Sequence, residues 1–182
     1  MDVDTNDAFR EAMGRFAGAV NIITTEEGGL PSGLIATAVC SLSFDPPSVL
    51  VCINKSASSH DTILRRGIFA VNLLSPALSN VARRFQSQKG SDRFEKKYWV
   101  AGKTGAPLLL GAPMALDCKL SHTHDGFSHS ILIGVVTDVQ LGEGDSHNSL
   151  LWQGRRYHKP MEYVELIRRP ADVQMIFEEM LF

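Results

Sequence analysis

The segment from Gly33 to Ser59 limits the possible folds of this chain more than any other stretch. Two apolar runs, residues 33–42 and 49–53, lie on either side of the tripeptide Asp45-Pro46-Pro47. Proline fixes the backbone φ angle and lacks an N–H group, so this tripeptide predicts a corner between two strands. Small polar residues follow each run and leave the backbone accessible. The segment therefore predicts two strands whose ends can bind a flat ligand that carries a phosphate group.

Short apolar runs alternate with turn residues along the rest of the chain. The sequence Glu26-Glu27-Gly28-Gly29 predicts a hairpin turn. Polar stretches predict loops over 86–98, 121–127 and 142–148. Residues that favour β structure predict further strands over 19–25, 68–74, 108–110, 114–120, 130–141 and 150–158. Short strands at close spacing favour a mainly β fold, an antiparallel barrel with peripheral helices, over a parallel sheet.

Three helices are expected around this barrel. The first begins at an N-cap, Asp7, and ends at Gly18, and its apolar face is formed by Phe9, Ala12, Met13 and Phe16. A short second helix is capped by Ser58 or Ser59 and closed by Gly67. A third begins with Pro76 in its first turn and continues to about Phe85.

The chain length, 182 residues and 20.0 kDa, predicts a single domain over 1–160 with a C-terminal extension over 161–182. Pro170 is expected to start a short amphipathic helix in that extension. Its apolar stripe is expected to pack on the chain's own core or on a dimer mate, and docking on a separate partner protein is the alternative. The stripe consists of Val173, Ile176, Phe177 and Met180.

Charge and cysteine usage exclude several classes of protein. The formal net charge is −2, and no basic stripe with interleaved aromatic residues suggests a nucleic-acid partner. Neither an apolar signal core nor a run long enough to span a membrane is present, which predicts a cytoplasmic protein. Three cysteines, Cys40, Cys52 and Cys118, lie in apolar runs and are expected to be buried free thiols.

Common catalytic motifs are missing from the sequence. It contains no G-x-G-x-x-G opening a βαβ unit, no phosphate loop of the G-x-x-x-x-G-K-[ST] type and no G-x-S-x-G elbow. The spacing of His122, His124 and His129 raises the question of a metal site. Since no Cys or Glu-x-x-His accompanies them, no metal is predicted, and His122 and His124 are expected to be solvated loop residues.

A series of motifs resembles the flavin reductase family with the FMN-binding split-barrel fold, the reductase components of two-component flavin-dependent monooxygenases. The resemblance covers residues 7–160, and the number and order of its motifs make it specific for the family. The motifs are Gly33-x-x-x-Thr37-Ala38-Val39-Cys40-Ser41-Leu42-Ser43-x-Asp45-Pro46-Pro47, Val51-Cys52-Ile53-Asn54-Lys55-Ser56, Gly67-Ile68-Phe69-Ala70-Val71-Asn72-Leu73-Leu74, Asp92-Arg93-Phe94, Gly105-x-Pro107-Leu108-Leu109, Ser128-His129-Ser130-Ile131, Gly134-x-Val136 and Gly154-Arg155-Arg156-Tyr157.

The resemblance implies a six- or seven-stranded antiparallel Greek-key split barrel that works as a homodimer, with the flavin near the dimer interface. It implies an NAD(P)H:flavin oxidoreductase that transfers hydride from NADH or NADPH to FAD or FMN. A partner monooxygenase would receive the reduced flavin. The sequence does not distinguish the two flavins or the two nicotinamides.

The resemblance also implies which residues hold the flavin. The isoalloxazine ring is expected against Thr37, Ala38, Val39, Cys40 and Ser41. The ribityl and phosphate groups are expected at Asn54, Lys55, Ser56, Ser58 and Ser59, where hydroxyl and N–H groups and one lysine charge suit an anion. Arg93 lies in a further family motif and is expected to contact the cofactor.

His129 is the candidate catalytic residue. Hydride transfer needs stacked rings rather than a protein nucleophile. The resemblance implies that His129 lies near the nicotinamide, where it would orient the amide or shield the stacked pair, and a purely structural histidine is the alternative. The family places such a histidine in a G-D-H or G-T-H element, whereas here Gly126-Phe127-Ser128 precedes it. Tyr157, with Arg155 or Arg156, is expected to contact the pyridine nucleotide.

Two other functions are compatible with the same fold. The flavin could be tightly bound and reduce another acceptor, such as a metal, a corrin or a quinone. The chain could also be a flavin-binding module without pyridine-nucleotide activity. A yellow preparation that oxidises NADH without added flavin would indicate the first, and flavin binding without NAD(P)H consumption would indicate the second.

Overall fold

A computed structural model describes residues 4–142 and 148–161 of the chain. Most of the loop predicted over 142–148 and the predicted C-terminal helix lie outside the described residues. The helices are α1 (Thr5–Gly14), α2 (His60–Arg66) and α3 (Ser79–Ser87), with 3-10 turns η1 (Pro76–Leu78), η2 (Gly90–Arg93) and η3 (Lys96–Tyr98). The strands are β1 (Gly18–Ala19), β2 (Asn21–Glu27), β3 (Leu30–Ala36), β4 (Val39–Phe44), β5 (Pro47–Asn54), β6 (Ile68–Leu73), β7 (Trp99–Ala101), β8 (Pro107–Leu109), β9 (Met114–Gly126), β10 (His129–Leu141), β11 (Leu151–Gln153) and β12 (Arg156–His158).

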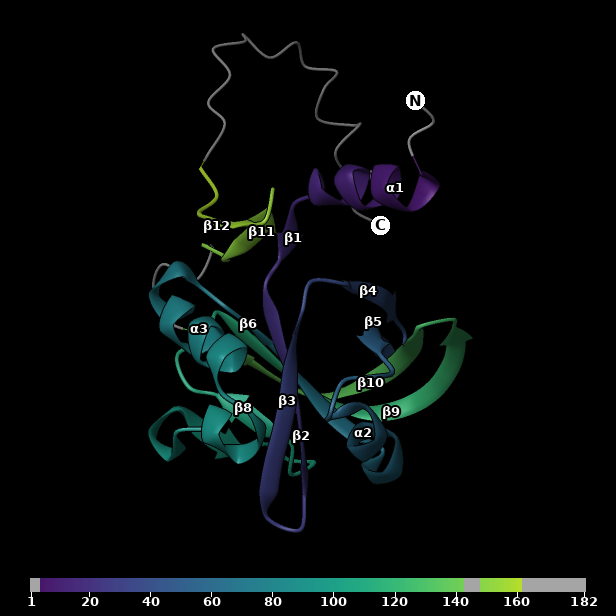
Figure 1. The fold of residues 1–182 in the computed structure, drawn as a ribbon. Helices are drawn as coiled ribbons and strands as arrows, with labels where there is room; N and C mark the ends of the chain where they lie inside the picture. Colours follow the sequence, from purple (N-terminus) through teal and green to yellow (C-terminus); the bar gives the residue numbers. More distant parts are fainter. Residues whose placement is uncertain (1–3, 143–147, 162–182) are drawn as a thin grey trace, which may run out of the picture.

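Seven of these strands form one antiparallel sheet in the order β3-β2-β6-β9-β10-β5-β4. This arrangement confirms the predicted mainly β fold with peripheral helices. Figure 1 shows the strongly curved sheet, with α2 on one side of the β2–β3 hairpin and α3 on the other. A small sheet of β1, β11 and β12 lies beside α1 at the end of the molecule.

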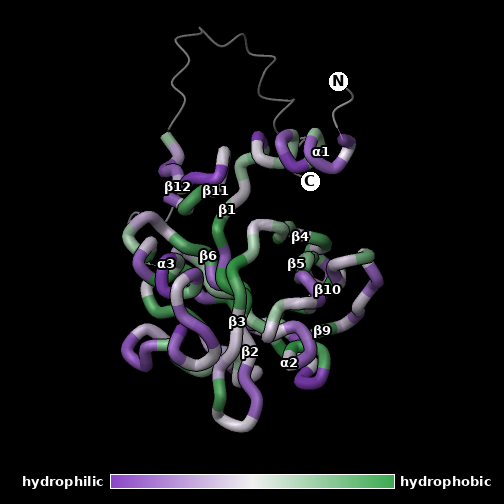
Figure 2. The backbone as a smooth tube through the Cα atoms, in the orientation of Figure 1, coloured by the Kyte–Doolittle hydropathy of each residue, from purple (hydrophilic) through white to green (hydrophobic). Residues whose placement is uncertain are grey.

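The core lies inside the curved sheet. Its side chains come from alternate positions of β5, β6 and β10, and Ile63 of α2 closes one side. Figure 2 shows hydrophobic residues along the inner strands and hydrophilic residues on the exposed helices. Fully buried members of this cluster are Ile23, Val51, Ile53, Ile63, Phe69, Val71, Cys118 and Leu132.

The apolar run 33–42 was predicted to be one strand, but it belongs to two. β3 ends at Ala36, Thr37 and Ala38 are exposed, and β4 begins at Val39. β3 pairs with β2 and β4 pairs with β5, so the chain crosses from one edge of the sheet to the other within two residues. Hydropathy gives no sign of this change of partner, because both strands are apolar. The corner at residues 45–47 is a hairpin turn between β4 and β5, as predicted.

The segment 121–127 was predicted as a loop, but most of it is strand. β9 continues to Gly126 and pairs with β10 as far as His129. Residues 121–125 are exposed because this end of the hairpin extends beyond the core. His122 and His124 therefore lie on a strand, with their rings stacked at 6.4 Å, and not in a loop.

Several smaller expectations also need correction. The N-terminal helix is capped by Asp4 rather than Asp7 and ends at Gly14 rather than Gly18, and none of its residues is buried. The predicted third helix is a 3-10 turn followed by α3, and two further 3-10 turns lie within 86–98.

The three cysteines are free, but they are not all buried as predicted. Cys40 is exposed and Cys52 half-buried, whereas Cys118 is buried. Burial, with a smaller effect of the adjacent Asp117, raises the pKa of the Cys118 thiol to about 12. Within residues 4–142 and 148–161, no helix is long and apolar enough to cross a membrane.

Gly134 is expected to be essential for the packing of β10. A Cβ atom at this position would lie 2.3 Å from Cζ of Phe69, which is fully buried. We expect Gly134→Ala to lower the free energy of unfolding by about 3 kcal/mol, because the core has no room for the added methyl group. Chemical denaturation measures this loss.

The double variant Gly134→Ala/Phe69→Leu provides the control, because leucine removes the ring atoms that the new methyl group meets. It should be more stable than the sum of the two single losses predicts. Strictly additive losses would show that the Gly134–Phe69 contact is not the cause.

Candidate functional site

A cavity of about 500 Å³ lies where the crossing between β3 and β4 meets the ends of β5 and β10. It brings together four of the predicted site residues: Thr37, Ala38, Asn54 and His129. The crossing is bonded to the sheet, because the Cys52 N–H donates to the carbonyl of Ala38 at 3.0 Å. The remaining lining residues are Leu34, Ile35, Ala36, Cys52, Gly126 and Ile131.

Strand register places His129 in this cavity. It lies opposite Asn54 of β5 and opposite Gly126 of β9. The side chain is half-buried, and its Nδ1 lies 2.9 Å from Oγ of Ser128. The other ring nitrogen has no hydrogen-bond partner in the described part of the chain. It is therefore available to a ligand in the cavity.

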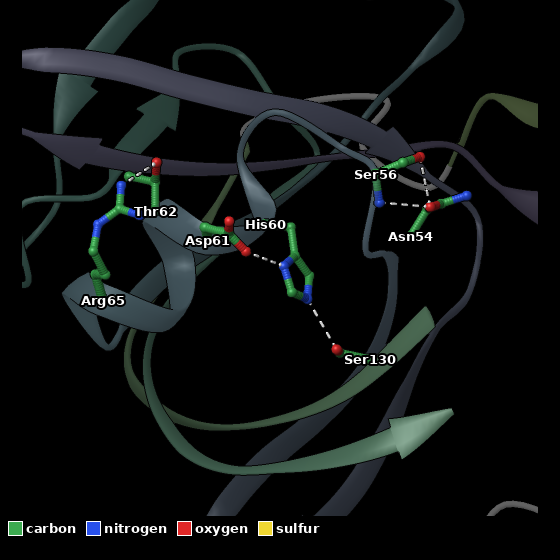
Figure 3. Close-up of polar contacts among 7 residues, drawn as sticks. All are labelled: Asn54, Ser56, His60, Asp61, Thr62, Arg65 and Ser130. Carbon is green, nitrogen blue, oxygen red and sulfur yellow. Dashed lines mark hydrogen bonds and ion pairs between the residues drawn. The ribbon is translucent and has the colours of Figure 1, made fainter. Parts of the chain in front are cut away.

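The segment from Asn54 to Ser59 forms a tight loop after β5. The Asn54 side-chain oxygen accepts hydrogen bonds from the backbone N–H and the hydroxyl of Ser56, both at 2.8 Å (Figure 3). These bonds use the donors of Ser56 that were predicted to bind a phosphate. In contrast, the backbone N–H groups of Ser58 and Ser59 donate to no acceptor among residues 4–142 and 148–161.

The Ser59 hydroxyl is a buried polar group without a partner. The residue is fully buried, and its Oγ makes no hydrogen bond within the described residues. An unpaired buried polar group costs about 1–3 kcal/mol. Because Ser59 is closed off from solvent, the unpaired backbone N–H of the exposed Ser58 is the donor that this loop presents to an anionic ligand.

Lys55 is already paired. Its Nζ lies 2.6 Å from Oδ1 of Asp125 on β9, and its backbone N–H donates to the carbonyl of Ser128 at 3.0 Å. The hydrogen bond from Lys55 is the main reason why the pKa of Asp125 is lowered. The positive charge predicted for the phosphate is thus partly neutralised by a carboxylate.

The remaining predicted site residues lie outside the lining of the cavity. Val39, Cys40 and Ser41 follow the crossing on β4, where Val39 is half-buried and the other two are exposed. Arg93 donates to the backbone carbonyls of Gln88 and Gly33, at 2.9 and 2.8 Å. These bonds attach the η2 turn to β3.

Tyr157 lies in a separate hollow of about 300 Å³. Its hydroxyl accepts a hydrogen bond from Gln86 at 2.7 Å, and its ring contacts Trp152 edge-on. Burial raises the pKa of this phenol. Basic residues line the same hollow: Arg83, His158 and Lys159.

Sequence reasoning missed the apolar wall of the cavity. Cys52 lies two residues before Asn54, and Ile131 lies two residues after His129. The alternation of strand side chains therefore places each of them on the same face as its site residue. That signal was available once the two strands had been predicted. The contribution of Leu34, Ile35 and Ala36 could not be predicted in this way, because it depends on where β3 ends.

The residues present fit a flavin. The apolar wall and the exposed crossing at Thr37 and Ala38 suit a flat ring, and the unpaired N–H group of the exposed Ser58 suits a phosphate. No three His, Cys, Asp or Glu side chains converge in a metal-binding arrangement within the described ranges.

The chain is similar to proteins of a known family. Residues 13–160 match the model of the flavin reductase like domain family. An FMN reductase (NADH), RutF, from Pseudomonas syringae is 43% identical over 152 residues, which are 83% of this chain and 84% of that protein.

Solved structures are also similar. Nitrilotriacetate monooxygenase component B from Mycobacterium thermoresistibile is 30% identical, with a TM-score of 0.82 over 92% of this chain and 94% of that one. The NADH:FAD oxidoreductase SgcE6 of Streptomyces globisporus is 28% identical, with a TM-score of 0.79 over 92% of this chain and 95% of the other. Since the family model spans most of the sequence, this chain belongs to the flavin reductase like domain family.

Proposed function

We propose that this protein is an NADH:flavin oxidoreductase that reduces FMN and supplies it to a partner monooxygenase. The observation that carries the proposal is the cavity in which Thr37, Ala38, Asn54 and His129 meet, in a chain of this family. FMN and NADH are preferred over FAD and NADPH because the relative named FMN reductase (NADH) is 43% identical, whereas the named FAD oxidoreductase is 28% identical.

A bound flavin accepts the hydride that NADH gives up, so the protein's task is to position two rings and to exclude water. Thr37 and Ala38 offer an exposed surface for one ring face, beside the wall formed by Cys52 and Ile131. His129 orients the nicotinamide from the strand end. The unpaired N–H group of Ser58, which is exposed on the loop, binds the phosphate.

One similar structure is named component B of a monooxygenase, a name that implies a further component. The proposed partner of this chain is therefore an oxygenase component. The proposed compartment is the cytoplasm, as the three free thiols suit a reducing environment.

We further propose that the protein is a homodimer, because a single chain leaves apolar surface uncovered. β4 is an edge strand, and its Leu42 is 49% exposed. On α1, Phe9 and Phe16 are 63% and 69% exposed. A second copy of the chain would cover such surfaces.

The dimer is tested with Leu42→Glu. A charge on the edge strand should convert the protein to a monomer in analytical ultracentrifugation, with little change in the folded core. Leu30→Glu is the matched control, because Leu30 is also an exposed leucine on an edge strand, β3. A wild-type monomer at micromolar concentration would contradict the proposal.

The reaction is tested by a steady-state assay in which NADH and NADPH are each combined with FMN and FAD. The highest kcat/KM is expected for NADH with FMN. The purified protein should be nearly colourless and should oxidise NADH only when flavin is added. A yellow protein that oxidises NADH without added flavin would instead indicate a tightly bound flavin.

His129→Ala tests the role of the strand-end histidine. We expect kcat/KM for NADH to fall about 10- to 100-fold because the nicotinamide is no longer held in line, while FMN affinity stays nearly constant. His122→Ala, an exposed histidine on β9, is the control. Full turnover by His129→Ala would remove this assignment.

Asp125→Asn tests the electrostatics of the phosphate loop. The amide oxygen can still accept from the Phe127 N–H, as the carboxylate does at 3.0 Å, but Lys55 is freed from a negative charge. FMN affinity should rise about two- to fivefold at low salt, since an exposed ion pair is worth less than about 1 kcal/mol. Riboflavin, which has no phosphate, should show no gain. An equal gain for riboflavin would contradict a phosphate contact.

A further inference from the structure

His60, the first residue of α2, is bonded through both ring nitrogens. Its Nδ1 lies 2.7 Å from Oδ1 of Asp61, and its Nε2 lies 2.9 Å from Oγ of Ser130 (Figure 3). The histidine is 7% exposed and Ser130 is 4% exposed. A buried imidazole that is bonded at both nitrogens is held in one orientation.

The bond to Ser130 connects two parts of the chain that the candidate site needs. Ser130 follows His129 in β10 and lies opposite Ile53 of β5. His60 directly follows Ser59, at the end of the loop that begins at Asn54. The loop is therefore attached to β10 at both ends: through strand pairing at Asn54, and through His60 at its other end.

The other attachments of α2 do not replace this bond. Ile63 is buried in the core, and Arg65 bonds Glu27 at the opposite end of the helix. Arg66 donates to the carbonyl of Glu26. Both arginine contacts fix the C-terminal end of α2 against the β2–β3 hairpin, and neither reaches the loop 54–59.

The order Ser130–His60–Asp61 has the hydrogen-bond pattern of a hydrolase triad, but the geometry excludes that chemistry. Ser130 alternates with His129 along β10, so it faces the core when His129 faces the cavity. With an exposure of 4% it cannot meet a substrate. For the same reason the array does not lead a proton into the cavity.

We propose that His60 is a positioning residue for flavin binding: its bond to Ser130 holds the loop 54–59 in register with the strand that carries His129. The inference rests on the proposed function. Without this bond the loop would keep only its β5 end attached to β10, and the ligand would have to order the exposed N–H group of Ser58 on binding. A serine hydroxyl donates or accepts, so the contact holds for either charge state of the imidazole.

The test compares His60→Leu, which removes the bond and keeps a buried side chain, with His60→Gln, whose amide can reach Ser130. FMN and riboflavin affinities are measured by fluorescence quenching, and kcat is measured at saturating FMN and NADH. His60→Leu should weaken FMN binding about tenfold, the effect of one lost hydrogen bond. Riboflavin affinity and kcat should change less than about twofold, and His60→Gln should recover most of the FMN affinity.

Ser130→Ala removes the same bond from the other side. It should weaken FMN binding as His60→Leu does, and the double variant should be no weaker than either single one. This variant also carries the test if His60→Leu does not fold. Arg65→Gln is the matched control, because it alters α2 at its other end and should leave FMN affinity unchanged.

Three results would overturn the inference: wild-type FMN affinity in folded His60→Leu and Ser130→Ala, an equal loss for riboflavin, or additive losses in the double variant. Failure of the proposed function has a different signature. In that case the wild-type protein itself would bind no flavin or would oxidise no NADH in its presence.

Discussion

The register of strand β10 is the constraint on which the candidate site depends. Pairing with β5 and β9 places His129 opposite Asn54 and Gly126 at one edge of the cavity. A shift by one residue would turn His129 into the core and Ser130 towards the ligand. The pairing with β5 continues without interruption to Gly134, where the ring of Phe69 leaves no space for a larger residue. Packing of the core therefore determines the chemistry at the strand end.

The crossing at Thr37 and Ala38 is the second determinant of the site. It joins two edge strands of one sheet, and such a short connection is possible only because the sheet curves until its edges approach each other. The crossing residues are exposed because they belong to neither edge. The proposed ring-binding surface thus lies where the curved sheet fails to close.

Much of this arrangement was predictable from the sequence. The corner at residues 45–47 and the strand after it follow from apolar runs and prolines, and the family motifs imply Asn54 and His129 as site residues, although not that they lie opposite each other. The end of β3, the length of β9 and the bond between His60 and Ser130 did not follow. Each depends on a partner distant in the sequence, and single-sequence periodicity carries no information about partners. The polar residues 121–125 led to the wrong prediction of a loop, because strands that extend beyond a core lose their apolar alternation.

The ion pair between Lys55 and Asp125 has a consequence for turnover. If a phosphate binds at Lys55 as proposed, the Asp125 carboxylate competes with it for the lysine charge. Such a competitor shortens the residence time of a phosphate at the loop without altering the ring-binding surface. A protein that must pass its product to a second enzyme benefits from rapid exchange more than from tight retention.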